Sequence, residues 1–385
     1  MKKSYKRSLL TTLLVMGALT VGTGSFTATQ ATTPVSTLQP MLHMKQAAMT
    51  ELANDSRVFT KNPAIDVKKV TFTNHYGYTV AGHLYLPADF TPTKAYKALV
   101  VSGPFGAVKE QVSGLYAQEM AKAGFVALAF DPSMTGESSG ERRNMASPDI
   151  FTEDYHAAVD FMSNLGFVDS NRIGAIGICG LSGMALTAAV NDIRIKAIAT
   201  SAMYDMSDSI RNHYKGDYYT PEQRELVKQQ LATMRNEEAK RGESIRGAHE
   251  MSVSADNKVQ TYDTMFPNIL PADADSVTTE FYNYYVKRAY HPRAINSNTS
   301  AWDATAAQGF FDFSLMNHLD EISPRPVLLI TGDKAHSKYF SDEVYEKLTS
   351  PKQEIVVPGA THTDLYDNMQ KIPFQDLINF FNTNL

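Results

Sequence analysis

The chain has 385 residues, of which 43% are hydrophobic and 10% aromatic, and its formal net charge is −5 at pH 7. This length allows a large buried core, and a slightly acidic chain without a basic stripe argues against a nucleic-acid-binding protein. No group of side chains has the spacing typical of metal ligands, so we expect no metal, no cofactor and a small-molecule substrate.

The N-terminal residues 1–31 have the three-part pattern of a secretory signal peptide. Basic residues open the chain, an apolar run covers 9–21, and a Thr/Ala-rich stretch ends near Ala31. The apolar run is too short to span a bilayer. We therefore expect export to the periplasm or the exterior, with no stable membrane anchor after cleavage. Residues 32–65 are expected to form a loose N-terminal arm, and the oligomeric state is left open.

The pattern from residue 66 onward predicts a mixed sheet. Segments 66–75 and 78–86 alternate in polarity and are joined by a short turn, which is typical of an antiparallel hairpin. Apolar runs then follow at 98–102, 125–130, 172–178, 195–201, 327–331 and 354–357. Helical patterns cover 110–123, 150–164, 182–191, 341–348 and 374–384. Continuous apolar strands alternating with helices predict a parallel sheet covered on both faces. We therefore expect an α/β domain over 66–385 with a mostly parallel, eight-stranded sheet.

The segment 205–323 does not fit that alternation. It contains no convincing strand, but it includes a charged helix at 221–240 and an aromatic-rich stretch at 281–291. A loop of this length without structure is improbable in a compact domain. We predict an inserted helical cap above the carboxyl ends of the strands, where ligands bind in open α/β sheets.

Cys179 is the only cysteine of the chain, and it lies between a predicted strand and a predicted helix in the run Ile-Gly-Ile-Cys-Gly-Leu-Ser-Gly. A sharp strand-to-helix turn exposes a nucleophile, and an unpaired thiol is costly in an exported protein. We therefore predict that Cys179 is a nucleophile, against the alternative of a small buried hydrophobic residue. Ser182 is the alternative nucleophile, but we expect it to begin the helix, where serine caps well.

Acyl transfer also needs N–H donors for the developing oxyanion. The backbone N–H of Gly180, directly after the thiol, is one predicted donor. The second is expected in the loop 102–108. Pro104 has no N–H, so we predict Phe105, with Gly106 as the next choice and a plain turn as the structural alternative. Asp131 and Ser138, in the loop 130–138, are expected to hold that loop.

A thiol needs a base, and histidine is best matched near neutral pH. His362 follows the last predicted strand in the run Gly-Ala-Thr-His-Thr-Asp, and we predict it as the general base. An acid should orient its imidazole. Asp333, directly after the strand 327–331, is the leading candidate, and Asp205 after the run 195–201 is the alternative.

Together these motifs resemble the α/β-hydrolase superfamily over 66–385, whose chain order is nucleophile, acid, histidine. The cysteine elbow is similar to that of dienelactone hydrolase, with its motif G-x-C-x-G-G, and the chain looks like a bacterial dienelactone-hydrolase-like branch. Leu181 replaces the small residue of that motif. Gly103 stands where the family has a glutamate. The lactone specificity of the family is therefore not carried over.

We expect a secreted hydrolase that cleaves a carboxylic ester or lactone through a covalent intermediate on Cys179. Two alternatives remain open at this point. A peptidase is possible because prolyl peptidases share the fold. A non-catalytic protein on the same scaffold is possible because fold alone does not establish activity.

Overall fold

A computed structural model describes residues 46–385, except positions 216 and 255. The predicted signal peptide at 1–31 and most of the predicted arm lie outside the described residues. Within the part that is described, no helix is both long enough and apolar enough to cross a membrane.

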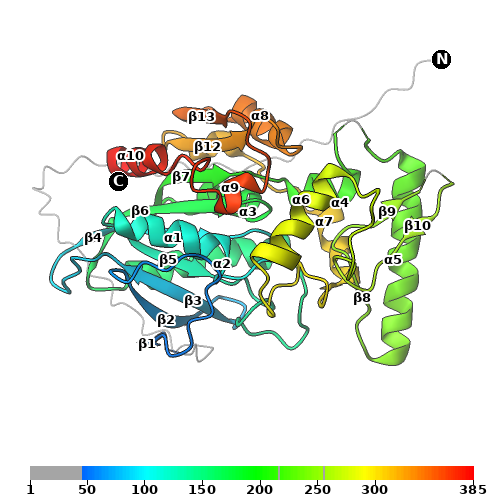
Figure 1. Ribbon diagram of the computed structural model, residues 1–385, viewed down its shortest axis with the longest axis horizontal. Coiled ribbons are helices and arrows are strands. Elements are labelled where there is room, and N and C mark those ends of the chain that lie inside the picture. The colour runs from blue at the N-terminus through cyan, green and yellow to red at the C-terminus, as the bar shows by residue number, and fades with distance from the viewer. Residues whose placement is uncertain (1–45, 216, 255) are drawn as a thin grey trace, which may run out of the picture. The chain divides into compact units, whose positions relative to one another are not determined.

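The core is one large, mostly parallel sheet (Figure 1). Its strands, in chain order, are β1 (Ala48–Glu51), β2 (Asp66–Thr73), β3 (Thr79–Leu86), β4 (Tyr96–Ser102), β5 (Val126–Phe130), β6 (Val168–Ile178), β7 (Ile195–Ser201), β12 (Val327–Gly332) and β13 (Lys352–Val357). Their spatial order is β1-β2-β3-β5-β4-β6-β7-β12-β13. All neighbours from β5 to β13 are parallel, and β1, β2 and β3 are antiparallel to their neighbours. The predicted α/β-hydrolase fold is confirmed.

The sheet has nine strands in the described chain rather than the predicted eight. The additional strand, β1, comes from the stretch that we expected to be a loose arm, and it pairs with β2 from Ala48 opposite Thr71 to Glu51 opposite Lys68. All four of its residues are exposed. An edge strand of this kind is held by main-chain hydrogen bonds, which leave no alternation of polarity in the sequence.

Helices cover both faces of the sheet. Their bounds are α1 (Val112–Lys122), α2 (Pro148–Ser163), α3 (Leu181–Asn191), α8 (Lys338–Lys347), α9 (Asp364–Asp367) and α10 (Phe374–Asn384). In β6 a side chain at Gly174 would meet Phe381 of α10, whereas one at Gly177 would meet Ser182 of α3. Positions three apart in a strand point to opposite faces, so α10 and α3 lie on opposite sides of the sheet. α2 packs against α3, and α1 joins α10 through the ring contact of Tyr116 with Phe374.

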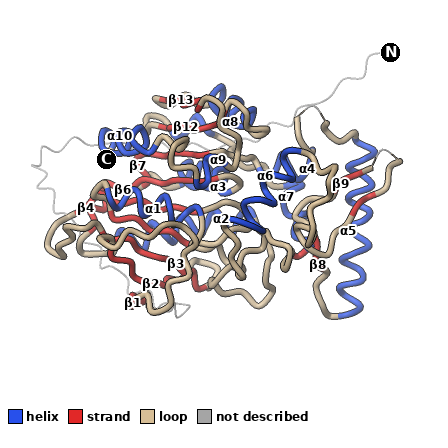
Figure 2. Tube along the Cα trace, in the orientation of Figure 1, coloured by secondary structure: helices blue, strands red, loops and turns tan. Residues whose placement is uncertain are grey.

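The cap begins after β7 and ends before β12, and Figure 2 shows that it consists mainly of helices and loops. Its helical segments are α4 (Met206–Asn212), α5 (Pro221–Arg241), α6 (Ser276–Tyr282), a π-helix (Asn283–Arg288), a 3-10 turn (Ala304–Ala307), α7 (Gln308–Asp312) and a second 3-10 turn (Leu319–Ile322). The expectation that it holds no strand is wrong. β8 (Arg246–Gly247) pairs with β11 (Trp302–Asp303), and β9 (Ser252–Val253) pairs with β10 (Val259–Gln260). Two-residue strands are too short to give a period-2 pattern.

The longest cap helix, α5, has clear signals at both ends. Thr220 and Gln223 form a reciprocal capping box at its start, with Pro221 in the first turn. Gly242 ends the helix in the left-handed region at φ 73°. These signals explain why the predicted bounds of the helix, 221–240, agree with the observed bounds to within one residue.

Candidate active site

Cys179 occupies the sharp turn between β6 and α3. Its φ is +54°, a left-handed conformation that costs a residue with a side chain free energy and is often found at functional sites. The turn is held by backbone bonds: the Cys179 N–H donates to Ser201 O at 2.9 Å, and the Cys179 carbonyl accepts from the N–H groups of Ser182 and Tyr204 at 3.0 and 3.1 Å. The strand-to-helix elbow therefore has the geometry that the sequence predicts.

Glycines make room for this elbow. A side chain at Gly177 would come within 2.5 Å of the Ser182 Cα, and one at Gly180 within 2.7 Å of Phe105. Gly103 has φ +105°, and a Cβ there would lie 2.1 Å from the Ile178 carbonyl oxygen. The elbow itself thus excludes a side chain at position 103. Leu181 is fully buried below the turn.

The two predicted backbone donors both lie at the Cys179 sulfur. The backbone N–H groups of Gly180 and Phe105 both act on the sulfur and lower the pKa of the thiol. Phe105 is anchored from the cap, because its ring stacks on Trp302 at 4.4 Å and its carbonyl accepts from Asn296 Nδ2 at 2.7 Å. If an acyl carbon were bonded to this sulfur, the carbonyl oxygen of the acyl group would lie within reach of both N–H donors.

The thiol is buried and protonated at neutral pH. Burial raises the pKa of Cys179 to about 11, against the smaller opposing effects of the Tyr366 hydroxyl and the two backbone N–H groups. Since the thiolate is the nucleophilic form, any chemistry at this sulfur near neutral pH requires a group that accepts its proton.

His362 lies in the same buried centre, in the loop after β13. Its Nδ1 lies 2.6 Å from the Ser337 hydroxyl and its Nε2 lies 2.9 Å from the Tyr366 hydroxyl. Burial, followed by the neighbouring His336, holds the pKa of His362 well below its usual range. The imidazole is therefore neutral at pH 7 and can accept a proton on one nitrogen.

Neither predicted acid reaches His362. The Asp333 carboxylate accepts the Gly359 N–H at 2.7 Å at an exposed position. Asp205 is the N-cap of α4, where it accepts from the N–H groups of Ser207 and Asp208. In residues 46–385, leaving out 216 and 255, no carboxylate hydrogen-bonds to this imidazole. The expectation that Asp333 contacts His362 is corrected: β12 ends at Gly332, so the next side chain points toward the loop 358–360.

Ser182 does not share the site. Its hydroxyl is buried and donates to the Gly177 carbonyl at 2.9 Å. Ser182 is the second residue of α3, whose N-cap is Gly180. The expectation that Ser182 caps the helix is therefore wrong. Ser182 braces the elbow from inside the first helical turn.

Two side chains at the centre were not predicted from the sequence. Ser337 lies at Nδ1 of His362, and Tyr366 lies at its Nε2 and lowers the pKa of Cys179. The only available hint for Tyr366 is its position four residues after His362, a spacing that puts two side chains on one side of a helical turn.

A second histidine connects the centre to the cap. The rings of His336 and His362 lie 5.1 Å apart. His336 Nδ1 is 3.3 Å from a carboxylate oxygen of Glu280 on α6, and its Nε2 contacts the Tyr204 hydroxyl. Glu280 also accepts from the backbone N–H and the hydroxyl of Thr363. The cap is therefore tied by a carboxylate to the loop that carries His362.

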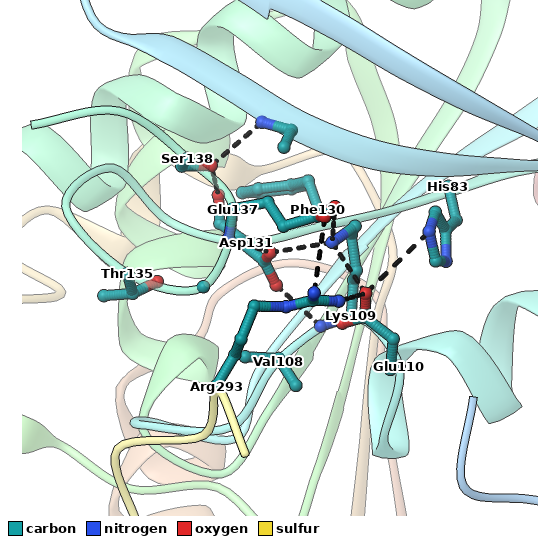
Figure 3. A network of polar contacts seen from close by, with 12 residues as sticks. His83, Val108, Lys109, Glu110, Phe130, Asp131, Thr135, Glu137, Ser138 and Arg293 are labelled. Carbon is teal, nitrogen blue, oxygen red and sulfur yellow. Dashed lines mark hydrogen bonds and ion pairs between the residues drawn. The ribbon is translucent and has the colours of Figure 1, made fainter. Parts of the chain in front are cut away.

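A buried ion-pair network supports the loop of Phe105 (Figure 3). Lys109 is fully buried, and its Nζ lies 2.9 Å from Glu110, 2.9 Å from Asp131 and 2.8 Å from Glu137. Asp131 also accepts the backbone N–H groups of Lys109 and Glu137 at 2.7 and 2.9 Å. The Ser138 hydroxyl donates to the Asp131 carbonyl at 2.6 Å. Asp131 and Ser138 thus hold this loop, as expected.

Three residues of this region have ligand atoms within 4.8 Å of one another, namely His83, Glu110 and Glu137. The ammonium of Lys109 already contacts two of the three, and Arg293 contacts Glu110 at 2.7 Å. Both carboxylates of this group are therefore paired with cations of the protein itself.

A model of the X-Pro dipeptidyl-peptidase (S15) family matches residues 77–364. Protein PA2218 of Pseudomonas aeruginosa is 42% identical over 381 residues, covering 99% of this chain and 96% of that protein. Its crystal structure covers 88% of this chain and 99% of its own, with a TM-score of 0.79. YcjY of Escherichia coli is 32% identical, covering 78% of this chain and 92% of that protein. The polyketide transferase GrgF of Penicillium is 23% identical, covering 77% of this chain and 89% of that protein. Its crystal structure covers 83% of this chain and 98% of its own, with a TM-score of 0.66 at 19% identity, and supports the fold.

Proposed function

The chain belongs to the X-Pro dipeptidyl-peptidase (S15) family of α/β hydrolases, and from this premise we propose that it hydrolyses a carboxylic ester or lactone with Cys179 as the nucleophile. The observation that carries the proposal is the sulfur on a strand-to-helix elbow at φ +54°, facing the N–H groups of Gly180 and Phe105. A purely structural cysteine requires neither a left-handed backbone nor two N–H donors directed at its sulfur.

The proposed first half-reaction forms a thioester. The thiol proton passes to His362 while the sulfur of Cys179 bonds to the carbonyl carbon. The π electrons of the carbonyl move to its oxygen, which accepts hydrogen bonds from Gly180 and Phe105. Collapse of this intermediate breaks the ester C–O bond, and the leaving alcohol takes the proton from His362.

In the second half-reaction, water attacks the thioester carbonyl and gives a proton to His362. The C–S bond then breaks, and the thiol of Cys179 regains that proton. The net reaction consumes one water and yields an acid and an alcohol, or a hydroxy acid from a lactone. Relatives named polyketide transferase and thiohydrolase support an acyl group as the transferred unit.

The test is a screen of p-nitrophenyl esters of increasing chain length, with lactones beside them. We expect Cys179→Ala to lose activity by on the order of 1000-fold or more, and Ser182→Ala to retain most of it. Turnover that survives unchanged in Cys179→Ala would refute the cysteine nucleophile.

A peptidase is the second candidate, because the matching family is described by X-Pro dipeptidyl-peptidase activity. The same thiol and donors would serve an amide, whose poorer leaving group needs a proton from His362. An Xaa-Pro-p-nitroanilide assayed beside the esters separates the two. Faster turnover of the anilide than of every ester would favour the peptidase, and no turnover of either would favour a non-catalytic protein.

We also propose that the protein is exported, on the three-part pattern at 1–31. A lone thiol in an oxidising compartment is protected if it is buried, and Cys179 is 7% exposed. Cell fractionation with N-terminal sequencing of the mature chain tests export. A cytoplasmic protein that retains Met1 would refute it.

A further inference from the structure

The Tyr366 hydroxyl stands between the two groups that must exchange a proton. It lies 2.9 Å from His362 Nε2, and it is close enough to the Cys179 thiol to lower the pKa of that thiol. Tyr366 comes from the short helix α9 and is fully buried. Both nitrogens of His362 are occupied, since Nδ1 faces Ser337. Over the described residues there is no direct hydrogen bond between the thiol and the imidazole.

The donor and acceptor capacities of these groups give the bridge a direction. A tyrosine hydroxyl has one proton to donate and lone pairs that accept. With Nδ1 protonated and bonded to Ser337, Nε2 accepts the Tyr366 proton, and the phenolic oxygen accepts from the thiol. The resulting chain is S–H to O–H to N, with every proton pointing toward His362.

The ionisation preferences agree with a relay in which the tyrosine carries no lasting charge. Burial raises the pKa of Tyr366 well above its usual range. The phenol therefore stays protonated near neutral pH and is not available as a phenolate base. It can pass its proton to His362 only if it receives another proton in the same step.

We propose that Tyr366 is a catalytic proton relay between Cys179 and His362. In acylation the thiol proton moves to the phenolic oxygen as the phenol proton moves to Nε2, and the freed sulfur electron pair bonds to the substrate carbonyl carbon. When the ester C–O bond breaks, the imidazolium gives its proton to the leaving oxygen, and the tyrosine, which gained one proton and lost another, is unchanged. The inference rests on the proposed role of Cys179, and it assigns the hydroxyl of Tyr366 a role that ring packing alone does not require.

The first test is Tyr366→Phe, which keeps the ring and removes only the relaying oxygen. We expect kcat on the best ester to fall on the order of 100-fold, the lower range for loss of general base catalysis, with a change of KM below about threefold. Tyr284→Phe is the matched control. Tyr284 is also buried and its ring packs 5.0 Å from that of Tyr366, but in the described chain its hydroxyl has no hydrogen bond to His362 and does not shift the pKa of Cys179. Equal activities of the two variants would overturn the relay.

The second test needs no substrate turnover, so it separates failure of the relay from failure of the proposed function. Iodoacetamide alkylates the single thiol at a rate that reports how readily its proton is removed. At pH 7 we expect Tyr366→Phe and His362→Ala to slow alkylation by similar factors, and the double variant to be no slower than either. Residues that act through one path give such non-additive effects.

Two other results of this cycle would overturn the relay. If His362→Ala slows alkylation and Tyr366→Phe does not, the imidazole reaches the thiol directly. If the two effects multiply in the double variant, the residues act independently. A protein that follows the expected cycle but cleaves no ester, lactone or anilide would retain the relay and refute the proposed function. Thermal melts of all variants exclude unfolding as the cause.

Discussion

The Ser337 hydroxyl lies 2.6 Å from His362 Nδ1, in the position where a triad acid would accept the imidazole N–H. A neutral hydroxyl orients the ring but stabilises an imidazolium less than a carboxylate does. Ser337→Ala removes one neutral hydrogen bond, worth about 1 kcal/mol. We expect kcat/KM on the best ester to fall about fivefold, with the fold intact by circular dichroism. A loss above 1000-fold would mean that Ser337 contributes as much to the rate as a carboxylate in this position would.

Asp333→Asn tests the alternative assignment. Its carboxylate accepts the Gly359 N–H at an exposed turn and, among the described residues, does not contact His362, so we expect activity within twofold of the parent enzyme. The amide oxygen still accepts that bond without the charge, and the free energy of unfolding should fall by roughly 1 kcal/mol or less. Steady-state kinetics and urea unfolding measure both. A large loss of kcat at unchanged stability would restore Asp333 as the catalytic acid.

The bounds of strands and helices, and the backbone groups fixed by their connections, could be predicted from the sequence. The strand 195–201 and the helix 374–384 were predicted with their observed bounds, because continuous apolar runs and amphipathic ends are local signals. The backbone donors Gly180 and Phe105 follow from where the elbow and the first loop must lie.

Side-chain direction was not predictable in the same way. We expected Asp333 to contact His362, but its side chain, directly after β12, points to a neighbouring loop. Ser337, four residues later, faces the imidazole instead. Tyr366 was missed because a buried tyrosine near a histidine reads as core. β1 was missed because main-chain pairing at an edge leaves no pattern in the side chains.

Reactivity of the thiol should rise with pH over an unusually high range. Burial raises the pKa of Cys179 to about 11, whereas an unperturbed cysteine titrates near about 8.5. In His362→Ala, which lacks the base, we expect the iodoacetamide rate to climb about tenfold per pH unit from 7 to 10, as the thiolate fraction does. The urea-unfolded chain should reach its plateau above about pH 9. A plateau below pH 9 in the folded variant would contradict the buried, protonated thiol.

The same shift has a consequence for stability. Because the folded pKa lies above the unfolded one, the protonated thiol contributes stability below the unfolded pKa, and this contribution is lost as pH rises toward about 11. Cys179→Ala removes the term. The difference in unfolding free energy between the parent protein and Cys179→Ala should therefore shrink between about pH 8.5 and 11. A difference that stays constant over this range would contradict the raised pKa.

Lys109 should be essential to the fold of the loop 102–108, which carries Phe105. Its buried ammonium contacts the carboxylates of Glu110, Asp131 and Glu137. Lys109→Met would leave these charges without their central partner, and breaking a buried ion pair in this way costs about 3–5 kcal/mol. Lys68→Met is the control, since Lys68 pairs at the surface with Glu51, and such pairs are worth about 1 kcal/mol or less. Urea unfolding should separate the two variants clearly.

Because Asp131 also holds the backbone of Lys109, four residues after Phe105, folded Lys109→Met should lose esterase activity while Lys68→Met keeps it. Equal stability and equal activity of the two variants would show that the network does not support the site.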